Sequence, residues 1–316
     1  MKLSTRVLAG VGVLLALVAG VLVATASPPM PCPPPPPPPP PVPPAPPLPP
    51  PPPPPPAQPP AKTVYVTVTP SNYTSVFAVV KAPPGPPPGT TVYVLKHEYW
   101  NSVIVFAPGT YTFPPAGKGS AYLVIVGTHV VLAGMSPRFK PTILAQNVVF
   151  VDVKAAVYGV KLVTNELAVY AHPHKAASLL MAYSSLTPGA SGLKLEAYSE
   201  DAAVTNLTLT STTAYSAAEA VIVAKTPPAK AYVKVGPYAN VEGGLKAYGY
   251  GPGYTGLTIV KAMVKGVVSA SYLSSVELVG SITAGLETHA VFNVSVTGSM
   301  LNYSYHPPVK TPHTIA

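Results

Sequence analysis

Short apolar runs rich in β-branched residues recur about every ten residues between Val103 and Tyr305, separated by Gly, Pro and Asn. Each run is too short for a helix, and β-branched residues fit the pleated surface of a strand. The runs are Val103–Phe106, Leu123–Val126, Val130–Leu132, Thr142–Leu144, Val148–Val153, Val157–Val163, Leu193–Tyr198, Val204–Thr210, Ala220–Ala224, Leu257–Val260, Val276–Ile282 and Val291–Val296. No helical periodicity lies between them, which argues against alternating strands and helices. With three strands to a coil, the pattern predicts an all-β solenoid of roughly seven to nine coils.

A β-sandwich or β-barrel is the alternative all-β architecture. Both need hairpins, yet the chain contains no Asn-Gly or Asp-Gly pair, the strongest short hairpin signal. Asparagines directly before apolar runs favour the solenoid, because Asn tolerates the left-handed conformation of a one-residue bend. They are Asn147, Asn165, Asn206, Asn240 and Asn293, and in a β-helix such residues stack in successive coils.

Three segments carry a family resemblance: Ala107–Tyr111 (APGTY) after a strand, then Val130–Gly134, then Pro141–Leu144. Together they resemble the first coils of right-handed parallel β-helix proteins of the pectin-lyase-like superfamily. The resemblance implies the fold. The enzymes of that family act on acidic polysaccharides with several carboxylates and often a basic residue. This chain has only Asp152 and Asp201 as aspartates, and Arg138 is its only arginine beyond the N-terminus. No active-site motif of the family is matched, so the resemblance implies no catalytic residue.

The N-terminus predicts export. Val7–Ala26 carries no charge and follows Lys2 and Arg6. As a helix at 1.5 Å per residue it would span about 30 Å, the thickness of a bilayer core. Ala24–Ala26 (ATA) also fits a signal-peptidase site. Residues 1–26 are therefore either a cleaved signal peptide or a membrane anchor, and the basic end directs the remainder outside the cell, either secreted or held at the cell surface.

A proline tract separates this segment from the strands. Proline fixes φ and lacks an N–H donor, so the tract is expected to form a polyproline II rod roughly 100 Å long. Cys32, the only cysteine, lies within it and has no internal disulfide partner. Three further strands, at Thr63–Thr69, Val76–Val80 and Thr91–Leu95, are expected to cap the solenoid. The predicted organisation is 1–26 signal or anchor, 27–62 stalk, 63–102 cap strands, 103–305 parallel β-helix and 306–316 tail.

Charge and composition constrain the partners. The chain has a net charge of +9 although only 9% of its residues are charged. The positive balance favours acidic glycans or anionic surfaces. Its lysines are scattered and no nucleic-acid-binding module is present, which argues against DNA or RNA. Asn72, Asn206, Asn293 and Asn302 begin N-glycosylation sequons, as expected of an exported glycoprotein.

Few residues could supply chemistry. Glu196, Glu200 and Asp201 form the best acidic group, suited to glycoside hydrolysis or to Ca²⁺, with Arg138 as the available basic residue. A solvated turn after a strand explains the same acids. His172 and His174 could both bind a metal, but two exposed histidines in a loop account for the pattern equally well. No cofactor is expected.

An aromatic group suggests binding. Tyr238, Tyr248, Tyr250 and Tyr254 flank Lys246 in a glycine-rich segment that we expect to be a loop. Tyrosine rings and a lysine can stack on a sugar and donate hydrogen bonds to it. Alternatively, the rings pack along the outside of a coil.

Three functional hypotheses follow. The first is a surface-displayed structural, adhesive or glycan-binding module, with an acidic polysaccharide or a cell-surface glycan as its partner. The second is a polysaccharide lyase or glycoside hydrolase acting on acidic glycans. The third is a self-associating filament or surface-layer subunit, since the ends of a solenoid can stack.

Overall fold

The computed structural model describes residues 63–81, 90–115, 119–136 and 138–301, which belong to one compact unit, 59–316. The expectations for residues 1–62, including Cys32, and for Asn302 and the tail fall outside these ranges. Within them strands are the main regular structure, and the only helices are two short 3-10 turns, η1 (Tyr73–Ser75) and η2 (His97–Tyr99). No helix among the described residues has the length and apolar character needed to cross a bilayer.

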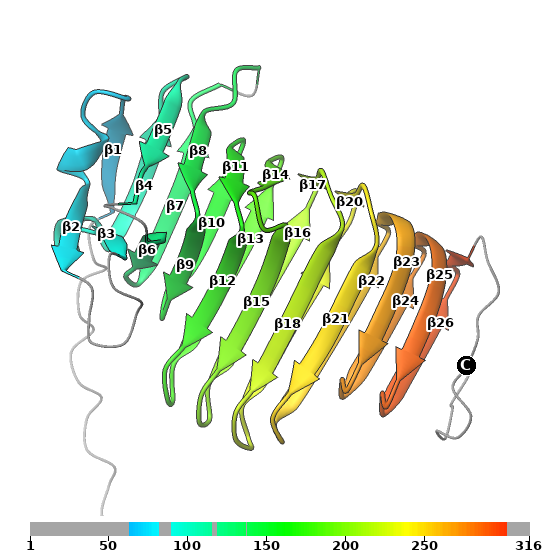
Figure 1. Cartoon of the computed structure of the whole chain (residues 1–316). Helices are drawn as coiled ribbons and strands as arrows, with labels where there is room; N and C mark the ends of the chain where they lie inside the picture. The colour runs from blue at the N-terminus through cyan, green and yellow to red at the C-terminus, as the bar shows by residue number, and fades with distance from the viewer. Residues whose placement is uncertain (1–62, 82–89, 116–118, 137, 302–316) are drawn as a thin grey trace, which may run out of the picture. The chain divides into compact units, whose positions relative to one another are not determined.

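Ten parallel strands form the first sheet, sheet A. In spatial order they are β1 (Val64–Val68), β4 (Asn101–Phe106), β7 (His129–Gly134), β10 (Lys154–Tyr158), β13 (Ala176–Ala182), β16 (Val204–Thr210), β19 (Lys230–Val235), β22 (Tyr254–Val260), β24 (Ser275–Val279) and β26 (Asn293–Thr297). The spatial order follows the chain, so each new coil adds one strand beside the last (Figure 1).

The second sheet, sheet B, contains two rows of parallel strands. Its long-strand row runs β3 (Thr91–Leu95), β6 (Ala121–Val126), β9 (Asn147–Val151), β12 (Glu166–Ala171), β15 (Leu193–Ser199), β18 (Ala218–Ala224), β21 (Leu245–Tyr250), β23 (Met263–Ser271) and β25 (Ile282–His289). Its short-strand row runs β5 (Thr110–Phe113), β8 (Thr142–Ala145), β11 (Lys161–Thr164), β14 (Ser185–Pro188), β17 (Thr213–Ala214) and β20 (Asn240–Val241). The row then continues through the first residues of β23 and β25 to β27 (Met300–Leu301).

Stacked coils place like residues above one another. In sheet A, Val130, Ala155, Leu179 and Leu207 occupy paired positions in successive strands, and all four are buried. Because side chains alternate along a strand, each inward column joins one continuous core and each outward column forms a row on the surface. The long parallel sheets fit a β-helix. Parallel pairing also excludes the hairpin-built sandwich or barrel, since the only antiparallel contacts described are β2–β3 and one isolated bridge.

The three strands predicted before the coils are present as β1, β2 (Phe77–Lys81) and β3. β2 pairs antiparallel with β3 at the start of sheet B. Aromatic rings fill this end of the core: Phe113 makes edge-to-face contacts with Tyr73, Phe77 and Tyr93 at centroid distances of 5.2, 5.4 and 5.1 Å.

Two predicted strands are in fact pairs of strands. Val157–Val163 is divided between β10 and β11, and Val276–Ile282 between β24 and β25. At the divisions Gly159 and Gly280 have φ values of +62° and +57°, which turn the chain sharply from one sheet to the next. Apolar residues lie within two positions of each glycine on both sides, so hydrophobicity alone does not reveal the turns.

The prediction that asparagines form the one-residue bends and stack in successive coils was wrong. Left-handed bends outside glycine are formed by other residue types, among them Asp152, His174, Tyr183, Lys261 and Tyr272, and no described asparagine has a positive φ. Nor do the asparagines stack. Glu166 is paired with Asn147, so the residue before it, Asn165, corresponds to Gln146 and not to Asn147. Asn206 lies inside β16, between Ser178 and Tyr232 on the neighbouring strands.

Candidate functional site

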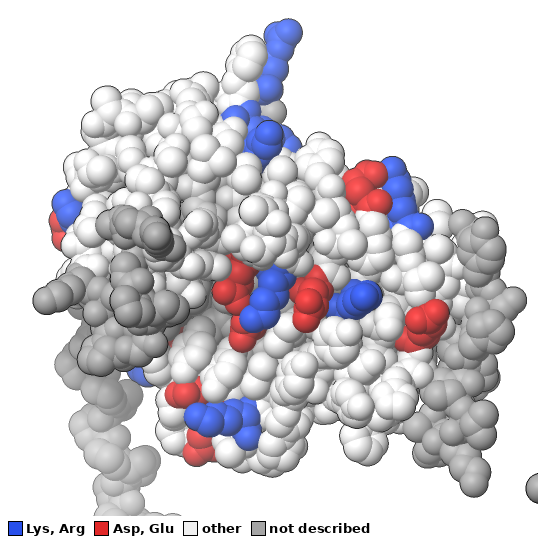
Figure 2. Space-filling view, in the orientation of Figure 1, with Lys and Arg blue, Asp and Glu red and all other residues white. Residues whose placement is uncertain are grey.

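A column of charged residues crosses the outer face of the long-strand row. Paired positions in β12, β15, β18, β21, β23 and β25 place these residues side by side. We call this column the charge ladder; its members are Glu166, Lys194, Glu219, Lys246, Ser269 and Glu287. Figure 2 shows acidic and basic side chains alternating across this face. The sign of the charge alternates from Glu166 to Lys246, and Ser269 then separates Lys246 from Glu287.

The first part of the ladder is a closed ion-pair cluster. Lys194 Nζ lies 2.9 Å from Glu166 Oε1 and 2.5 Å from Glu196 Oε2. Burial, and then hydrogen bonding to Glu166, raise the pKa of Glu196. Burial alone would raise the pKa of Glu166 too, but hydrogen bonds from Glu196 and Lys194 hold it below the ordinary value. The lysine therefore holds together two carboxyl groups that would otherwise repel each other.

An open hollow of about 740 Å³ lies beside the rest of the ladder. The ladder hollow, as we call it, is lined by Lys194, Glu219, Lys246, Ser269 and Glu287, by Tyr248, and by backbone at Gly192, Gly244 and Gly266. The coils approach closely here: a Cβ added at Gly266 would lie 2.5 Å from the backbone nitrogen of Gly244. Glycine at position 266 therefore lets the backbones of two coils meet, whereas a Cβ added at Gly192 would have no neighbour within 4 Å.

The structure brings together two of the five residues expected to bind a sugar. Lys246 and Tyr248 both project outward from β21 into the ladder hollow. The segment expected to be a loop is thus partly a strand, because Leu245 and Ala247 alternate inward into the core. Tyr250 is exposed at the end of the same strand.

The other two tyrosines lie elsewhere. Tyr254 begins β22 in sheet A, where its ring lies 5.6 Å from that of Tyr232 and its hydroxyl is 2.8 Å from Ser275 Oγ. Tyr238 is 80% exposed in the turn between β19 and β20. Neither residue lines the ladder hollow.

The three predicted acids do not form one group. Glu196 belongs to the lysine cluster, whereas Glu200 follows β15 and lies 3.7 Å from Lys225. At about 3.3 Å per residue the two lie roughly 13 Å apart along the chain. Asp201 accepts a hydrogen bond from Thr226 Oγ1 at 3.2 Å. Arg138 lies in the connection between β7 and β8, with its guanidinium 5.8 Å from the ring of Phe139.

The two histidines also separate. His172 Nδ1 lies 2.8 Å from Asp152 Oδ2, and its ring contacts that of Tyr170 at 4.8 Å. His174 occupies a left-handed bend, φ +61°, and its backbone nitrogen donates to the carbonyl of Asp201. Glu166 is the acid nearest to His172 in sequence, so the coil repeat supplies a partner that sequence proximity misses. Among the described residues, no three His, Cys, Asp or Glu side chains gather as metal ligands would.

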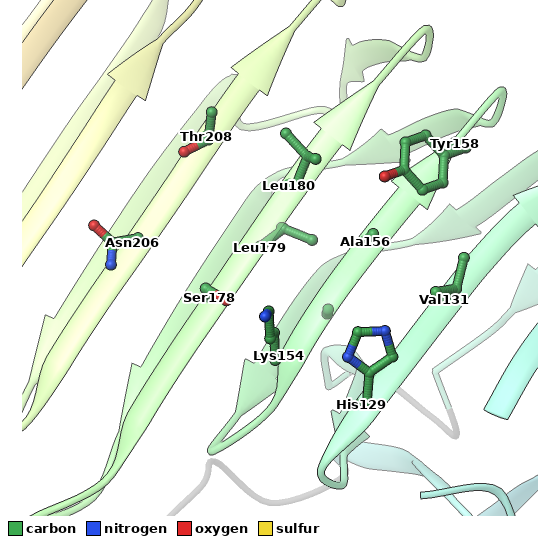
Figure 3. A pocket seen from close by; sticks show the side chains of 11 residues that line it. His129, Val131, Lys154, Ala156, Tyr158, Ser178, Leu179, Leu180, Asn206 and Thr208 are labelled. Carbon is green, nitrogen blue, oxygen red and sulfur yellow. The ribbon is translucent and has the colours of Figure 1, made fainter. Parts of the chain in front are cut away.

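A second, smaller hollow lies on the outer face of sheet A. This sheet A trough, of about 270 Å³, is shown in Figure 3. Val131, Ala156 and Leu180 form an apolar stripe, and a polar column flanks it. The column consists of His129, Lys154, Ser178 and Asn206 in adjacent strands. This trough was not predicted from the sequence, because apolar residues occupy both faces of β7, β10 and β13.

Three of the four sequons fall in the described chain. Asn72 is exposed, and its side-chain oxygen accepts from the backbone N–H of Thr69 at 2.7 Å. Asn206 lines the sheet A trough, so a glycan attached there would cover it. Asn293 is exposed at the start of β26.

Comparison with known proteins adds no family: no family model, curated protein or solved structure matches this chain.

Proposed function

We propose that this protein is a glycan-binding module displayed outside the cell, and that it binds its ligand on the charge ladder. The observation that carries the proposal is the ladder hollow, where charged side chains recur on neighbouring strands beside the hydroxyl of Ser269 and the ring of Tyr248. A repeating surface of this kind suits a repeating polymer.

The side chains at the hollow match the chemistry of a saccharide. Carboxylates accept hydrogen bonds from hydroxyl groups, an ammonium donates to sugar oxygens, and Ser269 can do both. The ring of Tyr248 offers a flat apolar surface beside them, with a hydroxyl at its edge. Gly192, where an added Cβ would have no neighbour within 4 Å, allows close approach of the ligand to the backbone.

The same proposal covers the remainder of the chain. We infer a right-handed β-helix of the pectin-lyase-like type, carried on a proline stalk and exported by the apolar N-terminal segment. The uncharged stretch at residues 7–26, the proline tract after it and the sequons support this organisation.

Glycoside hydrolysis is the second candidate function. Glu166 and Glu196 form a close carboxyl pair in which one pKa is raised and the other lowered, the usual property of an acid and its partner in such enzymes. Against this, the ammonium of Lys194 contacts both carboxylates. It therefore occupies the position where a sugar would have to enter, and binding is the better-supported function.

Binding of the full-length chain to an array of neutral and acidic polysaccharides tests the proposal. We expect retention of at least one polysaccharide, and about fivefold weaker binding by Tyr248→Ala, since a lost aromatic contact is worth about 1 kcal/mol. Tyr215→Ala is the control, because that ring is 58% exposed and does not line the hollow. Absence of binding to every polysaccharide would refute the proposal. Equal loss in both variants would place the site elsewhere.

A further inference from the structure

The charge ladder and its neighbour Glu196 carry more negative than positive groups. The carboxylates are those of Glu166, Glu196, Glu219 and Glu287, and the ammonium groups are those of Lys194 and Lys246. The balance is opposite to the chain's net charge of +9. A polyuronate or sulfated glycan would meet Glu219 and Glu287 on either side of Lys246. This face therefore disfavours the acidic glycans that the overall charge suggests.

The groups beside the hollow are available to a ligand. Lys194 is paired with two carboxylates, whereas Glu219, Lys246 and Glu287 have no ion-pair partner within 4.0 Å in the part of the chain that the structure describes. All three are exposed. They offer acceptor, donor and acceptor along one line. A polymer with hydroxyl groups on every unit can satisfy each of them without carrying charge.

The spacing of the ladder matches an extended saccharide. Neighbouring strands lie about 4.8 Å apart, close to the length of one sugar in an extended chain. A polymer lying across the strands would therefore present one sugar to each strand that it crosses. The hollow is bordered by β15, β18, β21, β23 and β25. Tyr248 projects from the central strand of these five.

We propose that the ladder hollow binds a neutral, hydroxyl-rich polysaccharide laid across the strands, with about one sugar for each strand crossed. The proposal rests on the glycan-binding function proposed above. It adds that the ligand is uncharged, that it lies across the strands, and how many sugars the hollow holds.

Titration of the full-length chain with neutral oligosaccharides of increasing length, such as β-linked glucose or mannose oligomers, tests the length. We expect affinity to rise with each added sugar up to about five units and then to level off. Oligogalacturonides of the same lengths should bind at least about tenfold more weakly. Preference for the acidic series, or a plateau at two sugars, would overturn the proposal while leaving glycan binding intact. Absence of binding to any saccharide would overturn both.

Charge reversal tests the selectivity independently. Glu219→Lys combined with Glu287→Lys should weaken binding of the neutral oligomer about tenfold or more and strengthen binding of the oligogalacturonide by a similar factor. Glu277→Lys is the control, because Glu277 is exposed on β24 in sheet A and does not line the hollow. If the double variant and the control behave alike, the ladder carboxylates do not face the ligand and the proposal is wrong.

Discussion

Replacement of Lys194 by methionine tests the electrostatics of the ladder. Methionine keeps most of the length of the side chain but removes the ammonium that binds Glu166 and Glu196. Breaking a fully buried ion pair costs about 3–5 kcal/mol. Lys194 keeps 39% exposure, so solvent screening reduces the expected loss to about 1–2 kcal/mol at pH 8.

The loss of stability in Lys194→Met should be larger at high pH than at low pH. In the native protein the raised pKa of Glu196 contributes stability that is lost as pH rises through the folded-state pKa. The lowered pKa of Glu166 contributes stability that is lost as pH falls, so the two effects oppose each other. Without the lysine both folded-state pKa values rise. The penalty is therefore largest at pH 7–8 and shrinks toward the ordinary glutamate pKa, about 4.3, where a shared proton removes the repulsion.

Chemical denaturation of the native chain and the variant at about pH 8 and about pH 4.5 measures this difference. The difference in free energy of unfolding between the two proteins at each pH cancels the contributions of groups that both contain, including the Asp152–His172 pair. Lys234→Met, at an exposed lysine of β19, should change stability little at either pH. A loss from Lys194→Met that is equal at both pH values would refute the reasoning. So would a double variant with Glu196→Gln that is no more stable at pH 8 than Lys194→Met alone.

Three further predictions concern the coils and the chemistry. Gly249→Ala should lower the free energy of unfolding by roughly 1–3 kcal/mol in a denaturation experiment, because the added Cβ would lie 2.2 Å from the carbonyl oxygen of Tyr272. Gly285→Ala is the control and should be nearly neutral, because its Cβ would lie 3.9 Å from the nearest atom. Tyr111→Phe should lower the free energy of unfolding by about 1–2 kcal/mol, since the buried hydroxyl lies 2.8 Å from the carbonyl oxygens of both Val68 and Ala107. Tyr250→Phe, at an exposed ring, should leave the stability unchanged. The protein should release no unsaturated or reducing ends from polyuronic acids, and turnover abolished by Glu200→Gln or Arg138→Ala would contradict this.

The strands were predicted well from the sequence where apolar and polar residues alternate regularly. Val204–Thr210 matches β16 to the residue, and Thr91–Leu95 matches β3. The prediction failed where apolar residues ran through a turn, as at Gly159, and where glycines interrupted a strand, as in β21. Hydrophobic periodicity reports burial, and a sharp left-handed turn between two buried strands leaves that signal unchanged.

The candidate site was harder to predict because it depends on register. Glu166 and Lys194 are 28 residues apart, and the coils differ in length, so no fixed period in the sequence aligns the ladder. Lys246 and Tyr248 could be selected by residue type and spacing, since both lie on one face of a strand. Asp152 and His172, 20 residues apart, meet only because the coil returns the chain to the same edge.

Lysine footprinting tests the central claim most directly, by acetylating the full-length chain with and without a saturating neutral polysaccharide and reading each site by mass spectrometry. Lys246 lies in the ladder hollow, whereas Lys154 lies in the sheet A trough. The account predicts that the polysaccharide protects Lys246 and leaves Lys154 as reactive as before. Protection of Lys154 with Lys246 unchanged would place the ligand on sheet A and contradict the account.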